Sequence, residues 1–212
     1  MKNYGKFIAW LIAVWFLFVL SASALHLFEN NSNRIGLAVA IAAVTPIVVF
    51  FLWLAASESF QRFAFSLNPR ILTSAQAWRM VGFTFVLLEA RGALPAIFAL
   101  PAGYGDMAIG ATASFVAWKL ASPAHRNSFV LWQLLGITDL VIAVSLGTTA
   151  GLISAQGPSM ALMTTLPLSL IPTFLVPLFV IFHVICIAQA RSWKAVSETV
   201  PQTMRPTQYH AI

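Results

Sequence analysis

Charged residues are scarce in this chain. Asp, Glu, Lys and Arg make up 8% of its 212 residues, against roughly a quarter in soluble domains, and 59% of the residues are hydrophobic. This composition excludes a soluble domain and predicts a polytopic membrane protein, in which spanning segments and short connections use nearly the whole chain. The net charge of +6 does not indicate nucleic-acid binding, because the basic residues are scattered at the ends of apolar segments.

Cysteine is also scarce, and the familiar catalytic motifs are missing. The single cysteine, Cys186, excludes an internal disulfide. The sequence has no Gly-x-x-x-x-Gly-Lys-Ser/Thr loop, His-Glu-x-x-His, Gly-x-Ser-x-Gly or dinucleotide fingerprint, which argues against ATP-driven transport and the common hydrolases. Three of the four histidines fall in loops or the tail, and His183 has only Cys186 nearby, so we expect no metal and no cofactor.

Six apolar segments are long enough to cross a bilayer as helices of about 20 residues. They cover residues 7–25, 35–56, 72–90, 104–121, 128–150 and 166–190, and they predict an all-α transmembrane helix bundle. Most basic residues then fall on the side of the N-terminus: Lys2, Lys6, Arg62, Arg70, Arg79, Lys119, Arg126, Arg191, Lys194 and Arg205. Only Arg34 and Arg91 fall on the other side, so both termini are predicted to be cytoplasmic.

The first segment has a second interpretation. Lys2 and Lys6 precede an apolar run that ends in small residues, which is also the pattern of a signal peptide. The length of the run and its aromatic residues favour an uncleaved span. Cleavage would leave five spans and the same topology.

Other segments are expected not to span. Residues 91–103 are apolar but short and contain two prolines, so we expect a re-entrant or interfacial half-helix near 92–102. Residues 57–70 predict an amphipathic piece on the cytoplasmic interface. The chain is thus expected to form one transmembrane domain, 1–191, followed by a polar cytoplasmic tail, 192–212.

Two aspartates, Asp106 and Asp139, fall inside predicted spans. Each shares a helix face with small residues, because these recur at three- and four-residue steps. The two stripes are Gly103, Asp106, Gly110, Ala113 and Ala117, and Gly136, Asp139, Ala143, Gly147 and Ala150. The small residues alone are typical of close helix packing. A carboxylate inside a bilayer is costly, however, and marks a functional site by default.

The two aspartates are predicted to lie at similar depth. Their spans are joined by a short loop, and counting from it at about 1.5 Å per residue places them within about 5 Å in depth. If they share a site, they cannot both ionise cheaply, so one keeps a proton or a cation lies between them. Alternatively, each has its own partner: Arg91 for Asp106, and Arg79 or His183 for Asp139.

Four further polar residues are candidates for the site. His183 is either a hydrogen-bonded core residue or a proton-transfer or ligand group. Glu89 and Arg91 can line an outer vestibule, and Arg79 is either a snorkelling anchor or part of the polar interior. The candidate binding residues are therefore Asp106, Asp139, His183, Arg79, Glu89 and Arg91, and no catalytic residue is assigned.

One stretch carries a resemblance to known sequences. Leu94-Pro95-Ala96-Ile97-Phe98-Ala99-Leu100-Pro101-Ala102-Gly103-Tyr104-Gly105-Asp106, followed by Gly136-Ile137-Thr138-Asp139-Leu140, resembles a group of uncharacterised bacterial integral membrane proteins over residues 76–190. The resemblance implies a bacterial inner-membrane setting and no activity or cofactor.

Three functions fit these observations. The first hypothesis is a channel- or transporter-like protein that passes protons, ions or a small solute; its small size predicts a homo-oligomer. The second is a membrane-embedded enzyme acting on a lipid-like substrate, with Asp139 and His183 as an acid–base pair. The third is a non-catalytic subunit or assembly factor of a membrane complex.

Overall fold

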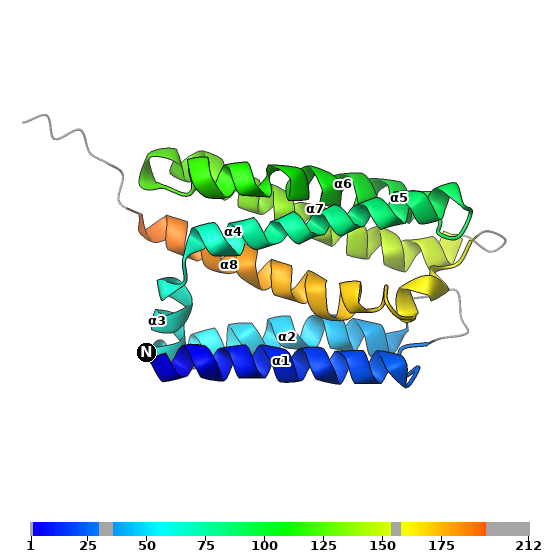
Figure 1. Ribbon diagram of the computed structural model, residues 1–212, viewed down its shortest axis with the longest axis horizontal. Helices are drawn as coiled ribbons and strands as arrows, with labels where there is room; N and C mark the ends of the chain where they lie inside the picture. Colours follow the sequence, from blue (N-terminus) through cyan, green and yellow to red (C-terminus); the bar gives the residue numbers. More distant parts are fainter. Residues whose placement is uncertain (1, 30–35, 154–157, 194–212) are drawn as a thin grey trace, which may run out of the picture.

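The computed structural model describes residues 2–29, 36–153 and 158–193. Within these residues every regular element is a helix and no strand occurs. In chain order the elements are α1 (Lys2–Ala24), α2 (Leu37–Ala56), α3 (Glu58–Ser66), α4 (Pro69–Ala75), η1 (Gln76–Gly82), α5 (Phe83–Ala90), α6 (Ala96–Phe115), η2 (Val116–Leu120), η3 (Pro123–His125), α7 (Arg126–Ile153), η4 (Met160–Thr164), η5 (Ile171–Leu175) and α8 (Val176–Ser192). The long helices lie side by side in a bundle, with α8 between the α1–α2 pair and the group of α4 to α7 (Figure 1).

Five helical stretches of the described residues are long and apolar enough to cross a membrane. They are Tyr4–Ala24, Leu37–Ala56, Pro69–Ala90, Pro123–Ala150 and Ile171–Ser192. The predicted all-helical class is therefore confirmed, while the sixth span, predicted at 104–121, is not among the five. Those residues belong to the greater part of α6 and to the π-helical turn η2, and they include Asp106 and Lys119.

The half-helix expected near 92–102 is not confirmed. Residues 96–102 form the first turns of α6, which continues through Pro101 to Phe115. A proline removes only one helical hydrogen bond, and packing against neighbouring helices can keep the helix intact. The last span also differs from its prediction, because helix begins only near Ile171 rather than at residue 166.

One end of the bundle collects most of the basic residues. The start of α1, all of α3, the starts of α4 and α7, and the ends of η2 and α8 lie together there (Figure 1). These ends carry Lys6, Arg62, Arg70, Lys119, Arg126 and Arg191. Arg91 follows α5 at the opposite end. The expected tail falls almost wholly at 194–212, outside the described residues.

The short helix α3 closes this basic end. Its Phe60 is buried and stacks on Trp53 of α2, with ring centroids 4.3 Å apart, whereas Glu58 and Arg62 are exposed. Gln189 of α8 donates through Nε2 to three carbonyls at the end of α3, the nearest being that of Leu67 at 2.7 Å. The amphipathic character expected for 57–70 is thus present in α3.

Helix α1 packs along the outside of the bundle. Trp15 and Phe16 contact the ring of Phe174 in η5, with centroid distances of 4.6 and 5.1 Å. Whether α1 is removed as a signal peptide stays a prediction.

Candidate functional site

Arg79 lies at the centre of a buried charged cluster. The 3-10 helix η1, in the middle of the third long stretch, places it between α6 and α7, and its side chain is only 1% exposed. Its Nε donates to Oδ1 of Asp106 at 2.7 Å, and its Nη2 donates to Oδ2 of Asp139. The two aspartate side chains are 13% and 16% exposed. One guanidinium therefore bridges two carboxylates from two different helices.

The remaining donors of Arg79 point to α7 and α8. Nη1 donates to the carbonyl of Gly136 at 3.1 Å and lies 3.4 Å from Nε2 of His183. Arginine has no acceptor, so Nε2 of His183 accepts this hydrogen bond. The ring proton is then on Nδ1, which donates to Oε1 of Gln133. Four of the five N–H donors of the guanidinium are engaged.

A line of buried polar side chains continues from His183 toward the basic end. Nε2 of Gln133 donates to Oγ1 of Thr73 at 3.0 Å, and Oγ1 of Thr73 lies 3.7 Å from Sγ of Cys186. Sγ of Cys186 lies 3.8 Å from the carbonyl of Pro69, at the first residue of α4. A connected network of this kind satisfies polar groups that would otherwise be costly to bury, and it holds Arg79 and His183 in one orientation.

Glycines make room for the cluster. A Cβ at Gly105 would overlap the carboxylate of Asp139, and a Cβ at Gly136 would overlap the ring of His183. A Cβ at Gly82 would overlap the aspartate side chain of α6. Small residues let helix backbones approach closely in a membrane, and here the approach brings ionisable side chains against bare backbone. Of these three glycines, Gly136 belongs to a small-residue stripe, whereas Gly82 and Gly105 lie outside both stripes.

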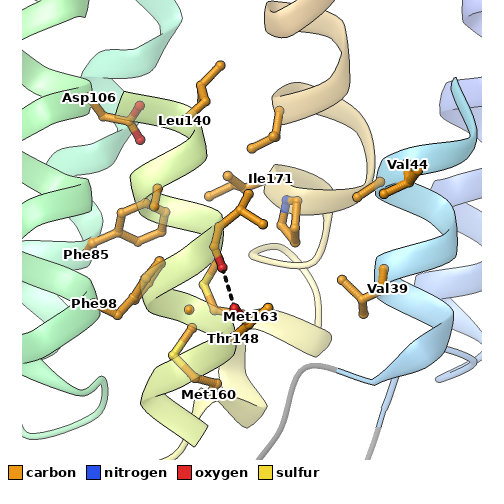
Figure 2. Close-up of a pocket in the computed structure, with 17 residues that line it drawn as sticks. Val39, Val44, Phe85, Phe98, Asp106, Leu140, Thr148, Met160, Met163 and Ile171 are labelled. Carbon is orange, nitrogen blue, oxygen red and sulfur yellow. Dashed lines mark hydrogen bonds between the residues drawn. The ribbon is translucent and has the colours of Figure 1, made fainter. Parts of the chain in front are cut away.

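Two cavities reach Asp106. One of about 20 Å³ also touches Arg79 and has room for a single water molecule. The other, of about 130 Å³, lies between α2 and the helices α5 to α7 and is almost wholly apolar. Figure 2 shows Phe85, Phe98 and Met160 along this larger cavity, with Asp106 at its edge. Its size is close to that of apolar cavities that admit benzene.

Four of the six predicted site residues come together in this cluster: Arg79, Asp106, Asp139 and His183. The interpretation of Arg79 as a snorkelling anchor is wrong, because the side chain is buried and bonded to both aspartates. Arg91 does not neutralise Asp106, since it is exposed beyond the end of α5. Glu89, half-buried in the last turn of α5, is also outside the cluster.

Among the buried polar residues that sequence reasoning missed, Thr73, Gln76 and Gln133 share a helical stretch with a residue of the cluster. Gln76 donates through Nε2 to the carbonyl of Phe179 at 3.4 Å. Thr73 and Gln76 precede Arg79 at three-residue steps, and Gln133 precedes Gly136 by the same step. Polar residues recurring along one helix face were the signal that could have found them. Among the described residues, no three His, Cys, Asp or Glu side chains are placed to hold a metal ion.

Residues 34–191, about three quarters of the chain, match the model of a protein family described as a domain of unknown function, DUF8737. The chain belongs to the DUF8737 family. No curated protein and no solved structure matches it. The DUF8737 region contains every residue of the cluster and begins after α1. An uncharacterised family was predicted from the sequence and is found; its bacterial membrane setting stays a prediction.

Proposed function

We propose that the protein is a multi-pass membrane protein of the channel or transporter type, whose buried cluster takes up a proton or a small cation. The charge balance of the cluster carries this proposal. One guanidinium faces two carboxylates, and Arg79 is the one cation in ion-pair contact with either of them within the described residues. When both carboxylates are ionised, one negative charge is in excess between apolar helices, where an unpaired charge is costly. A proton or a small cation removes that excess.

The backbone around the cluster supports the same proposal. The third long stretch changes from α-helix to 3-10 helix at Gln76–Gly82, the element that carries Arg79. A π-helical turn at Ile171–Leu175 precedes α8, which carries His183. Interrupted helices beside a polar site are typical of secondary transporters, and 3-10 stretches within a helix often mark functional hinges. The small cavity beside Asp106 has room for the water or ion that such a site handles.

The enzyme hypothesis has less support. It needs Asp139 and His183 to reach a cavity open to a lipid-like substrate. His183 has no exposed surface and does not line the apolar cavity beside Asp106. The hypothesis of a non-catalytic subunit gains support if the purified protein conducts neither protons nor cations.

We further propose a bacterial inner-membrane location with the basic end in the cytoplasm. The support is the concentration of lysine and arginine at one end of the bundle, as the positive-inside rule requires. A homo-oligomer or a membrane partner is part of the proposal, because so few helices form only a thin wall around a pathway.

The test is flux through liposomes that contain the purified full-length protein. A pH-sensitive dye reports proton movement under an imposed potential, and tracer uptake reports Na⁺ and K⁺. Asp106→Asn and Asp139→Asn each leave one carboxylate for one guanidinium, so each is expected to abolish flux. Glu58→Gln is the matched control, because it removes an exposed carboxylate of α3 that is 86% exposed.

Either of two results contradicts the proposal. Absence of flux in the parent protein removes the proton and cation function. Unchanged flux in both folded aspartate variants shows that any pathway runs elsewhere. Size-exclusion chromatography of each variant confirms that it is folded before flux is compared.

A further inference from the structure

A groove on the surface of the bundle runs along α4 and η1 and is bordered by Trp118 of η2. It extends from Asn68 to Val81, is open along its length, and has a volume of about 950 Å³. It lies on a different face of these elements from the cluster, since Arg79 is absent from its lining and is buried. The groove is polar at one end and apolar along the rest.

The polar end of the groove offers hydrogen-bond donors from Asn68, Arg70 and Ser74. The guanidinium of Arg70 lies over the ring of Trp118, with Cζ 5.8 Å from the ring centroid. Oδ1 of Asn68 accepts from the backbone N–H of Arg70 at 2.9 Å, which leaves the amide N–H groups as donors to a ligand. The hydroxyl of Ser74 lies one turn after Arg70, and among the residues that the structure describes no aspartate or glutamate lines the groove. This end is therefore complementary to an anion.

The apolar part follows one helix face. Ile71, Trp78 and Val81 line it at helical spacing and are 66%, 71% and 37% exposed. From Asn68 to Val81 the chain rises roughly 22 Å, at about 1.5 Å per residue in α4 and about 2.0 Å per residue in the 3-10 helix η1. One leaflet of a bilayer has about 15 Å of hydrocarbon plus its interface, so the groove spans the depth of a single leaflet.

We propose that this groove binds an anionic phospholipid. The phosphate lies against Arg70 and the amide of Asn68, and an acyl chain follows Ile71, Trp78 and Val81 into the leaflet. The polar end belongs to the basic end of the bundle, and basic sites on the cytoplasmic side attract anionic lipids. The proposal rests on the membrane location proposed above and not on the transported species. A second copy of the chain is less suited to the groove, because that copy would have to place an acid at the polar end of the groove and apolar side chains along the rest of it.

Native mass spectrometry of the detergent-purified full-length protein tests this. The probes are phosphatidylglycerol and phosphatidylcholine with the same acyl chains, titrated separately. We expect tighter binding of phosphatidylglycerol, and a roughly fivefold loss of that preference in Arg70→Gln, as follows from about 1 kcal/mol per basic residue near a membrane surface. Arg62→Gln is the matched control: Arg62 is also an exposed arginine of the basic end, but it pairs with Glu58 at 3.4 Å and does not line the groove. Trp78→Ala is expected to weaken both lipids alike.

The proposal is overturned if Arg70→Gln keeps the full preference for phosphatidylglycerol, or if both arginine variants lose it equally. A dimer that forms in place of the lipid adduct and is lost in Trp78→Ala also overturns it, since the groove then belongs to a second copy. The liposome experiment distinguishes a failure of this proposal from a failure of the proposed function. Selective lipid binding without flux supports the lipid site and contradicts the proposed function. Flux without selective lipid binding contradicts the lipid site alone.

Discussion

Replacing Arg79 with glutamine tests the charge balance of the cluster directly. The side chain is 1% exposed and is the shared partner of Asp106 and Asp139. Glutamine keeps an amide that can donate hydrogen bonds but removes the positive charge. The carboxylates of Asp106 and Asp139 then remain buried near each other without their shared cation.

The expected cost is large. Removing one partner of a buried ion pair typically costs 3–5 kcal/mol, because an uncompensated buried charge remains. With a melting temperature shift of about 2–4 °C per kcal/mol for a protein of this size, Arg79→Gln is expected to unfold on the order of 10 °C below the parent. Thermal unfolding in a mild detergent, followed by size-exclusion chromatography of the heated samples, measures the shift.

A compensated variant makes the reasoning refutable. Arg79→Gln combined with Asp106→Asn and Asp139→Asn contains no charge in the cluster, so most of the lost stability is expected to return. Arg91→Gln is the control for removal of an arginine, because Arg91 is exposed at the opposite end of the bundle. The reasoning is refuted if Arg79→Gln has the same melting temperature as the parent, or if the triple variant is no more stable than the single one. Either result would show that the ion pairs do not stabilise this region.

Three further predictions concern the surroundings of the cluster. Gly105→Ala is expected to lower the free energy of unfolding by about 1–3 kcal/mol, because the new methyl group overlaps the carboxylate of Asp139. A melting temperature equal to the parent's would contradict this and show that α6 can shift to make room. Gln133→Leu leaves Nδ1–H of His183 without its acceptor, so it is expected to lower the free energy of unfolding by about 1–3 kcal/mol, measured by the same thermal assay. A gain in stability would contradict this. Cys186 is 1% exposed, so a maleimide dye is expected to label the folded protein slowly and the heated protein at once, and rapid labelling of the folded state would show that α8 opens locally.

The sequence predicted a similar depth for the two aspartates for a simple reason, while it left open whether they share a site. Helical rise and a short connection are regular, so the depth of Asp106 and Asp139 in neighbouring helices could be counted. Rotation about a helix axis is less regular, and it decides whether an arginine near a helix end points to the interface or into the bundle. For Arg79 the rotation was encoded in Thr73 and Gln76, which lie on the same face and are fully buried.

The half-helix near 92–102 could not be judged in the same way. Glycine and proline predict an interruption locally, but the outcome depends on what the neighbouring segment offers. Here α6 continues because it packs tightly on the third stretch: a Cβ at Gly103 would lie 2.9 Å from the carbonyl oxygen of Gly82 and 2.7 Å from Val86. This close approach of α6 to the third stretch is a tertiary contact, so the local sequence around Pro101 does not predict it.

The cluster also divides the bundle into a part joined by polar contacts and a part joined by apolar contacts. Charges and hydrogen bonds join η1, α6, α7 and α8, whereas α2 meets its neighbours through apolar side chains and rings such as Phe50 and Trp53. In a bilayer, lipid tails compete on nearly equal terms with apolar contacts of this kind. Within the part of the chain that the structure describes, sliding α2 away therefore separates no ion pair. The 130 Å³ cavity lies along this same seam, between Val39 of α2 and Phe98 of α6, so a movement of α2 that opens the cavity parts apolar surfaces and leaves the charged cluster intact.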